Sequence, residues 1–275
     1  MQNLTPVLSS KAPPLWTKDE IEFVRLNIGK LTYKQMGKTI NRTPTAIQSK
    51  VRKLPFQQKI KKYQINSNFF KKWNSEMAYI LGFISADGNI SRHGRAHMLQ
   101  IASDDKDVIK KIINTLNSSS PIMERSRWNG KVSYQFRVSN KIIFNDLIKL
   151  KITERKSLTL TPPQIPKAYI SHYLRGFFDG DGSVYVNKRS NSIVSEWYSA
   201  SVKMANYIYK NIKHICPEFK GNVSKVLTPK KDRYYYSITL GHRDSLILFR
   251  YLYKNATIYM NRKYIKFIEG GAHNA

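Results

Sequence analysis

The chain has little cysteine and no long apolar run. A single cysteine, Cys216, occurs among its 275 residues, which excludes an internal disulfide framework and zinc sites built from several cysteines. The longest nearly apolar run, 77–86, is about half of the roughly 20 residues that a membrane helix needs. The opening residues also lack the charged and apolar regions of a secretory signal. We therefore expect an intracellular protein without a membrane span, either in the cytoplasm of a bacterial or phage-infected cell or in an organelle.

Acidic residues are scarce as well. The chain has 18 Asp and Glu against 47 Lys and Arg, which gives a formal net charge of +29, and the excess runs through both its first 75 residues and the remainder. Because 41% of the residues are hydrophobic and 12% aromatic, the chain can still bury a core, so a disordered polycation is excluded. This balance favours a polyanionic partner, usually nucleic acid. On charge alone, a solubility surface or a membrane-surface binder is the alternative.

Residues 16–54 are predicted to form three short helices. Two capping boxes and one proline-led start mark where they begin: Thr17 with Glu20, Thr32 with Gln35, and Thr43 with Pro44. In the third helix an apolar stripe leaves Lys50 and Arg52 facing outward. This order of helices resembles Myb-like and other helix-turn-helix modules, which implies that residues 1–55 bind DNA through the third helix. A solvated basic face on a small packing domain is the alternative, and residues 56–74 are interpreted as a basic linker lying on DNA.

An internal repeat dominates the rest of the chain. The stretch ILGFISADG at 80–88 returns 94 residues later as LRGFFDGDG at 174–182, with Asp87 matched to Asp181. Each copy is followed by the same predicted order of two strands, a helix, two strands and another helix. Between two alternating segments, Asn129-Gly130 predicts a tight hairpin turn. Each half is therefore expected to be αββαββα, and the two halves to form a pseudo-twofold pair.

The composition of the repeated motif indicates closely packed helices. Small residues at four positions would let two helix backbones approach each other: Ala78, Gly82, Gly176 and Gly180. Each motif helix is expected to end at its Asp-Gly, with the glycine in a left-handed cap. Asp87 and Asp181 would then lie close together at helix C-termini, where the helix dipole disfavours a carboxylate. A divalent cation such as Mg²⁺ would relieve this conflict; two ordinary caps on core helices are the alternative.

Two such motifs in register, each followed by the same topology, resemble the signatures of a single-chain LAGLIDADG homing endonuclease over residues 69–267. The resemblance implies an α+β fold, a pseudo-twofold pair of αββαββα repeats at 75–160 and 161–275 with saddle-shaped antiparallel sheets, preceded by the three-helix domain. It also implies a monomeric, site-specific endonuclease for double-stranded DNA, connected with intron or intein mobility, with Mg²⁺ or Mn²⁺ as cofactor. A DNA-binding regulator that does not cleave and an RNA-splicing maturase are the alternatives, and the presence of both aspartates favours the enzyme.

The resemblance implies particular site residues. Asp87 and Asp181, with the carbonyl groups of Ala86 and Gly180, would bind metal for phosphodiester hydrolysis. Lys141, just after the fourth strand of the first half, and Lys203, at the end of the second strand of the second half, correspond to basic residues of the family's catalytic pocket. An ordinary phosphate contact or a solvated side chain is the alternative for each. The two motifs differ at one position, because Ser85 in the first copy replaces Asp179 of the second.

The strands are predicted to supply the DNA-reading surface. Apolar and polar residues alternate along 132–138 and 233–240, so one face of each strand packs and the other is open. The resemblance implies that these open faces lie in the major groove. The residues expected to contact DNA are Arg125, Arg127, Gln135 and Arg137 in the first half, and Lys225 and Arg233 in the second. An exposed sheet face of mixed charge is the alternative.

Overall fold

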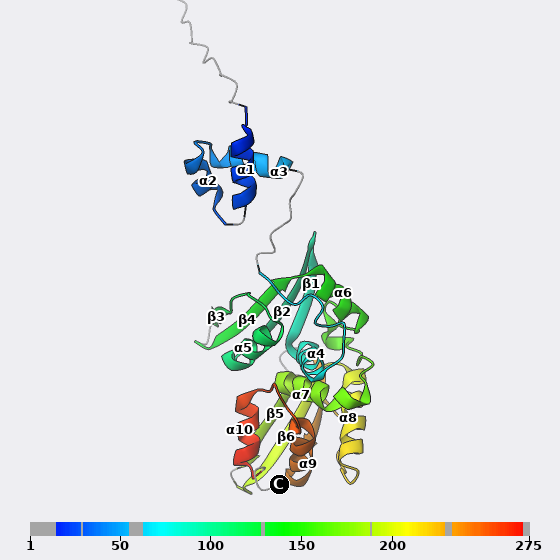
Figure 1. Ribbon diagram of the computed structural model, residues 1–275. Helices are drawn as coiled ribbons and strands as arrows, with labels where there is room; N and C mark the ends of the chain where they lie inside the picture. The colour runs from blue at the N-terminus through cyan, green and yellow to red at the C-terminus, as the bar shows by residue number, and fades with distance from the viewer. Residues whose placement is uncertain are drawn as a thin grey trace, which may run out of the picture. The chain divides into compact units, whose positions relative to one another are not determined.

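A computed structural model gives the fold of the chain (Figure 1). The structure describes residues 15–28, 30–54, 63–127, 130–187, 189–228 and 233–271. The chain divides into two compact units, Met1–Lys62 and Tyr63–Ala275. Each unit has its own hydrophobic core.

The first unit consists of three short helices. They are α1 (Lys18–Asn27), α2 (Tyr33–Thr39) and α3 (Pro44–Lys53). Both expected capping boxes are present, and Thr43 caps α3 by accepting from the Ala46 backbone N–H. Lys50 differs from the expectation that it faces outward. It is half-buried, and its ammonium group lies 5.4 Å from the ring centroid of Trp16, so its side chain lies against this ring.

The second unit contains two αββαββα repeats, which confirms the predicted fold. The first repeat comprises α4 (Ser75–Asp87), β1 (Gly88–His93), β2 (Ala96–Ser103), α5 (Lys106–Thr115), β3 (Met123–Ser126), β4 (Val132–Ser139) and α6 (Lys141–Lys149). The second comprises α7 (Ile170–Asp181), β5 (Gly182–Asn187), β6 (Ser192–Ser199), α8 (Val202–Ile215), β7 (Ser224–Thr228), β8 (Arg233–Leu240) and α9 (His242–Tyr253). A further helix, α10 (Asn261–Glu269), follows, and two short 3₁₀ turns, η1 (Lys156–Leu158) and η2 (Lys167–Tyr169), lie between the repeats.

Each repeat forms its own four-stranded antiparallel sheet. The strand orders are β1-β2-β4-β3 and β5-β6-β8-β7, so the two sheets have the same topology. The expected hairpin between β3 and β4 includes Asn129, which lies outside the described residues, while Gly130 has the positive φ of 75° that such a turn requires. The outer face of each sheet is the face opposite its buried core residues.

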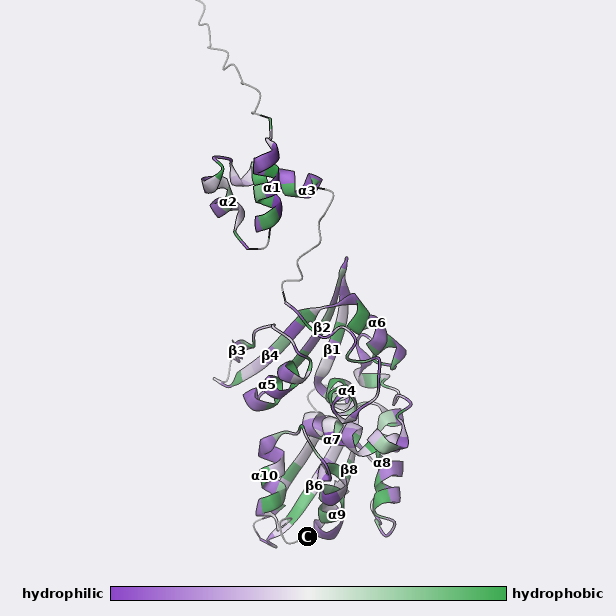
Figure 2. Ribbon diagram, viewed as in Figure 1, coloured by the Kyte–Doolittle hydropathy of each residue, from purple (hydrophilic) through white to green (hydrophobic). Residues whose placement is uncertain are grey.

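Amphipathic helices cover the core face of the sheets. Figure 2 shows hydrophobic and hydrophilic residues on the same helix in α8 and α10. In α8 the buried side chains recur with the spacing of one helical face: Met204, Ala205, Ile208 and Ile212. Burial of these side chains explains why short polar helices are stable here.

The motif helices α4 and α7 pack against each other where the two repeats meet (Figure 1). A Cβ atom on Gly82 would overlap the backbone carbonyl of Tyr173, and one on Gly176 would overlap the carbonyl of Tyr79. The two contacts are related by the pseudo-twofold, because the tyrosines and the glycines are offset by the same number of residues. Only glycine permits this approach of the backbones.

We expect Gly176→Ser to destabilise the protein by about 3 kcal/mol or more, because the helices must separate or distort to admit the side chain. Urea unfolding followed by circular dichroism measures the change. Gly241→Ser is the matched control, since Gly241 has open space around it and is the N-cap of α9, a position that serine favours. Equal stability of the two variants would show that the helices do not depend on this contact.

Candidate metal and nucleic-acid site

The two motif aspartates lie at the ends of the packed helices. Asp87 is the last residue of α4, and Asp181 is the last residue of α7. Both line one pocket of about 350 Å³, together with Ala86 and with residues of the second sheet. Neither carboxylate has a hydrogen bond or an ion pair to another described residue, so their oxygen atoms are free to accept a ligand.

The glycines that follow these aspartates were expected to be left-handed caps, and this expectation is wrong. Gly88 has φ −82° and Gly182 has φ −87°, so both are extended and begin strands β1 and β5. The reason for glycine is space, since a Cβ on Gly88 would strike Ile84, and one on Gly182 would strike Phe178. The chain therefore leaves each helix directly into the sheet and keeps the aspartate at the junction.

Burial and charge shift the ionisation of both aspartates. Burial raises the pKa of Asp87, and it raises the pKa of Asp181 to about 7 with a further contribution from the charge of Asp87. The ammonium groups of Lys156 and Lys263 lower the pKa of both carboxyl groups and so favour their charged forms. The Asp87 side chain is nevertheless exposed and that of Asp181 half-buried, so two carboxylates that a ligand can reach share one pocket with two buried cations nearby.

Lys156 and Lys263 occupy equivalent places at the two helix ends. The Lys156 Nζ atom donates to the carbonyl oxygen of Gly88 at 2.5 Å, and the Lys263 Nζ atom donates to that of Gly182 at 2.6 Å. Lys263 also donates to the carbonyl oxygens of Phe178 and Asp179, at 2.6 and 2.7 Å. The side chains are 6% and 3% exposed, and burial lowers the pKa of Lys156 and lowers that of Lys263 to about 8. Each lysine therefore satisfies carbonyl groups that the helix end leaves unpaired.

Sequence reasoning missed both of these lysines. Lys156 lies in a 3₁₀ turn, Lys263 lies in α10, and neither belongs to the repeated strand-helix pattern. The two are not at a constant offset from their motifs, so the alignment of the repeats could not reveal them. In a chain with 47 Lys and Arg residues, no other signal distinguishes them.

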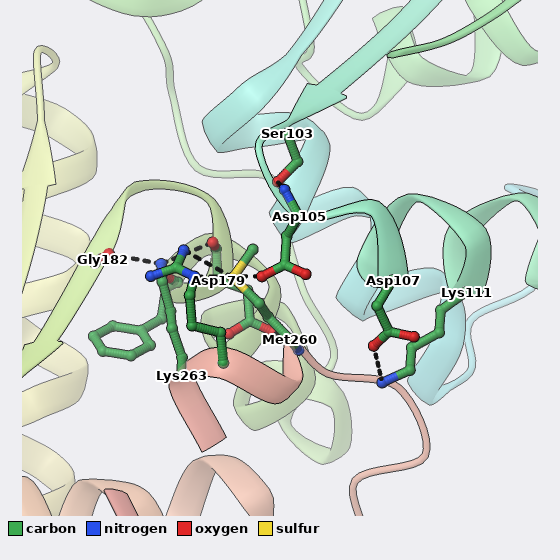
Figure 3. Close-up of polar contacts among 10 residues, drawn as sticks. Ser103, Asp105, Asp107, Lys111, Asp179, Gly182, Met260 and Lys263 are labelled. Carbon is green, nitrogen blue, oxygen red and sulfur yellow. Dashed lines mark hydrogen bonds and ion pairs between the residues drawn. The ribbon is translucent and has the colours of Figure 1, made fainter. Parts of the chain in front are cut away.

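Asp179 anchors α10 so that Lys263 reaches the end of α7 (Figure 3). Its Oδ2 atom accepts from the Tyr79 hydroxyl at 2.7 Å and from the Met260 backbone N–H at 2.8 Å, directly before α10 begins. In the first repeat, Ser85 takes this place and accepts from the Tyr173 hydroxyl at 3.0 Å. The substitution between the motifs therefore makes the two halves of the site unequal.

The two lysines expected in the catalytic pocket do not line it. Lys141 is the first residue of α6 and is exposed. Lys203 was expected at the end of a strand, but β6 ends at Ser199 and Lys203 lies exposed in the first turn of α8. The reason is the cap at Ser201, whose hydroxyl accepts from the Met204 N–H and turns the chain into a helix before Lys203.

In the first repeat, the residues expected to contact DNA divide between exposed and buried positions. Arg125 is exposed and Arg137 half-buried, both on the outer face. Gln135 lies on the same face but is only 4% exposed, so its expected contact with DNA is not supported by its position. Arg127 follows β3, and its guanidinium group is 2.7 Å from the Asp104 carboxylate.

In the second repeat, the two expected residues lie on opposite faces of the sheet. Arg233 is exposed and alternates with the buried residues of β8, which places it on the outer face. Lys225 pairs with Tyr236, which shares the face of the core residue Ile238. The Lys225 ammonium group lies 4.0 Å from the ring centroid of Tyr234 on that face, so the grouping of Lys225 with Arg233 is wrong.

Comparison by sequence relates only part of the chain to known proteins. No protein-family model matches the chain. An uncharacterized protein of Methanocaldococcus jannaschii is 27% identical over 168 residues, which are 58% of this chain and 60% of that protein. A probable translation initiation factor IF-2 of the same organism is 30% identical over 122 residues, which are 42% of this chain and 10% of that protein. The chain thus spans less than two thirds of either relative.

Solved structures with a similar fold include LAGLIDADG proteins. The homing endonuclease I-WcaI bound to its DNA recognition sequence is 15% identical, with a TM-score of 0.46 over 72% of this chain and 90% of that one. I-DmoI in complex with DNA and Ca is 14% identical, with a TM-score of 0.44 over 71% and 94%. The N-terminal LAGLIDADG domain of DUF199/WhiA is 15% identical, with a TM-score of 0.43 over 68% and 87%. The chain's own two repeats, with their motif helices packed together, agree with the resemblance stated from the motifs.

None of the described helices is both long enough and apolar enough to cross a bilayer.

The raised pKa of Asp181 predicts a pH-dependent stability in the absence of metal. Between about pH 4 and pH 7 the folded state keeps a proton on Asp181 that the unfolded state has released, so the free energy of unfolding falls as the pH rises. The Asp181→Asn variant has no carboxyl group at this position, so its free energy of unfolding does not fall in this way. Its stability advantage over the wild type should grow by about 3 kcal/mol from pH 5 to pH 8 in EDTA.

Urea unfolding at both pH values measures the advantage. Glu124→Gln is the control, because Glu124 is an exposed carboxylate paired with Lys106 and should not show this growth. An advantage for Asp181→Asn that is the same at pH 5 and pH 8 contradicts the shift.

Proposed function

We propose that the chain is a divalent-metal-dependent endonuclease that cuts double-stranded DNA at specific sites. The observation that carries the proposal is the pair of carboxylates, exposed Asp87 and half-buried Asp181, which share one pocket at the ends of two packed helices and have no hydrogen-bond or ion-pair partner among the described residues. Two like charges in such a place cost stability, so their retention favours a ligand that compensates them. DNA is the substrate that the net charge of +29 favours.

The residues fit a hard divalent cation such as Mg²⁺ or Mn²⁺. Asp87 and Asp181 offer unpartnered carboxylate oxygens, and the carbonyl groups of Ala86 and Gly180 lie at the same helix ends. Those of Gly88 and Gly182 already accept from the two buried lysines. A bound ion would polarise the scissile phosphate and activate water there.

The chain's own groups have separable tasks in this proposal. Asp87 and Asp181 hold negative charge where the two DNA strands would approach the pseudo-twofold. Lys156 and Lys263 favour the ionised state of both aspartates. Lys263 donates to three carbonyl groups and so has no proton left for substrate. Lys156 donates to the carbonyl of Gly88 and is buried, so its task is likewise to hold the end of its motif helix.

The experiment that tests this function uses a randomised duplex library. The protein is incubated with the library in Mg²⁺ or in EDTA, and the cut ends are sequenced. We expect double-strand ends that share a consensus in Mg²⁺ and none in EDTA. Ends without a consensus, or equal numbers of ends in both conditions, contradict the proposal.

A DNA-binding protein that does not cut is the second candidate. Within the described ranges no group of three or more His, Cys, Asp and Glu side chains could hold a metal, so only two carboxylates are available. A regulator would need the basic sheets and the front unit but neither aspartate.

We expect Asp87→Asn and Asp181→Asn each to abolish cleavage and to leave DNA binding largely intact. Each change removes an oxygen ligand and a negative charge while it keeps the shape of the side chain, and it relieves the repulsion between the pair. Cleavage of a selected target is compared with its binding in a gel-shift assay. Unchanged turnover in both variants would remove the metal assignment.

The front unit is proposed to contact DNA beside the cleavage site through α3, where Arg52 is exposed. Removal of residues 1–62 should weaken affinity and shorten the protected region on one side only, because one unit is added to a core with two repeats. Footprinting of the full and truncated chains measures both effects. If footprints and affinities coincide, the unit has another partner.

A further inference from the structure

The outer faces of the two sheets differ in chemistry at equivalent positions. Ile101 of β2 and Trp197 of β6 are equivalent, because each pairs with the glycine that follows a motif aspartate. One residue earlier, on the outer face, the first sheet has Gln100 and the second has Glu196. The register thus places a neutral amide and a carboxylate at matching points of the two surfaces.

The residues directly opposite Gln100 and Glu196 also differ in charge. Gln100 is directly opposite Arg137 of β4, and Glu196 is directly opposite Thr239 of β8. The first sheet therefore presents an amide beside a cation, and the second presents a carboxylate beside a hydroxyl. No ion pair joins Glu196 to a cation in the part of the chain that the structure describes.

Glu196 is held in place by hydroxyl groups. The Tyr198 hydroxyl donates to its Oε2 atom, and the Thr239 hydroxyl lies 3.4 Å from its Oε1 atom. Burial and then the bond to Glu196 raise the pKa of Tyr198, which keeps this hydroxyl protonated as a donor. Tyr198 also lines the pocket of Asp87 and Asp181. Glu196 is therefore an oriented acceptor close to the proposed cleavage site.

A carboxylate on this face is repelled by DNA phosphates. It therefore favours binding only where it accepts a hydrogen bond from a donor group on the DNA. The major-groove edges of cytosine and adenine present an amino group, N4 or N6, whereas guanine and thymine present acceptors at the corresponding position. Building on the proposed function, we propose that Glu196 selects a base with such an amino group, cytosine or adenine, in the half-site that the second sheet covers. Gln100 and Arg137 read the equivalent position of the other half-site, so the two half-sites differ in sequence.

Selection of bound duplexes from a randomised library tests this inference without any cleavage. The full chain and its Glu196→Gln variant are compared in EDTA, with thermal unfolding to show that both are folded. Every base pair carries one such amino group, so Glu196 is expected to distinguish the strand that holds it. The wild type should select cytosine or adenine, and exclude guanine and thymine, on one and the same strand at one base pair in one half-site. The variant should lose about tenfold or more of that preference, while the preferences at other positions remain.

Glu124→Gln serves as the matched control. Glu124 pairs with Tyr134 on the core face of the first sheet, so the variant makes the same change in charge away from the proposed DNA surface. It should raise affinity at low salt as Glu196→Gln does, and it should leave every base preference unchanged.

Three results would overturn the inference. One is a Glu196→Gln variant that binds all sequences more tightly and keeps the wild-type preferences. Another is a wild-type preference, at the position where the variant loses its preference, for A·T or for G·C pairs in both orientations, since such a preference does not depend on the strand that carries the amino group. A wild-type chain that selects no sequence overturns the proposed function and this inference together, whereas a selected site whose preferences do not depend on Glu196 leaves the proposed function standing.

Discussion

The close contact between α4 and α7 is the constraint on which the rest of the molecule depends. Gly82 and Gly176 let each helix backbone touch the carbonyl of a tyrosine on the other helix. Because the helices run together to their C-termini, Asp87 and Asp181 line one pocket, and strands β1 and β5 begin directly after these two residues. A single packing interaction thus joins the two repeats and builds the candidate site.

The site is a balance of opposite charges. Desolvation raises the pKa of both carboxyl groups, and the charge of Asp87 adds to the rise at Asp181, whereas the two lysines lower both pKa values while they satisfy carbonyl groups at the helix ends. The balance is not symmetric, because Asp179 ties α10 to α7 and Ser85 does not offer an equivalent anchor. The same asymmetry continues on the sheets, where Glu196 replaces Gln100.

The repeated motif made most of the fold predictable from the sequence. The period of the repeat and the alternating segments indicate two αββαββα halves, and the capping residues indicate where the helices of the first unit begin. Asp87 and Asp181 could be recognised because they are part of the repeat. Lys156 and Lys263 could not, since tertiary packing brings them to the helix ends from segments outside it. The predicted position of Lys203 was wrong because the helix cap at Ser201 was not recognised. That of Lys225 was wrong because its pairing with Tyr236 places it on the core face of the sheet.

The central claim is that Asp87 and Asp181 together hold a divalent cation against DNA. Anomalous diffraction from crystals of the chain with a selected duplex and Mn²⁺ tests it most directly. The account predicts manganese peaks within coordination distance of the oxygen atoms of both carboxylates. Peaks at other residues only, or a complex with ordered DNA at this pocket and no manganese between DNA and the aspartates, would contradict it.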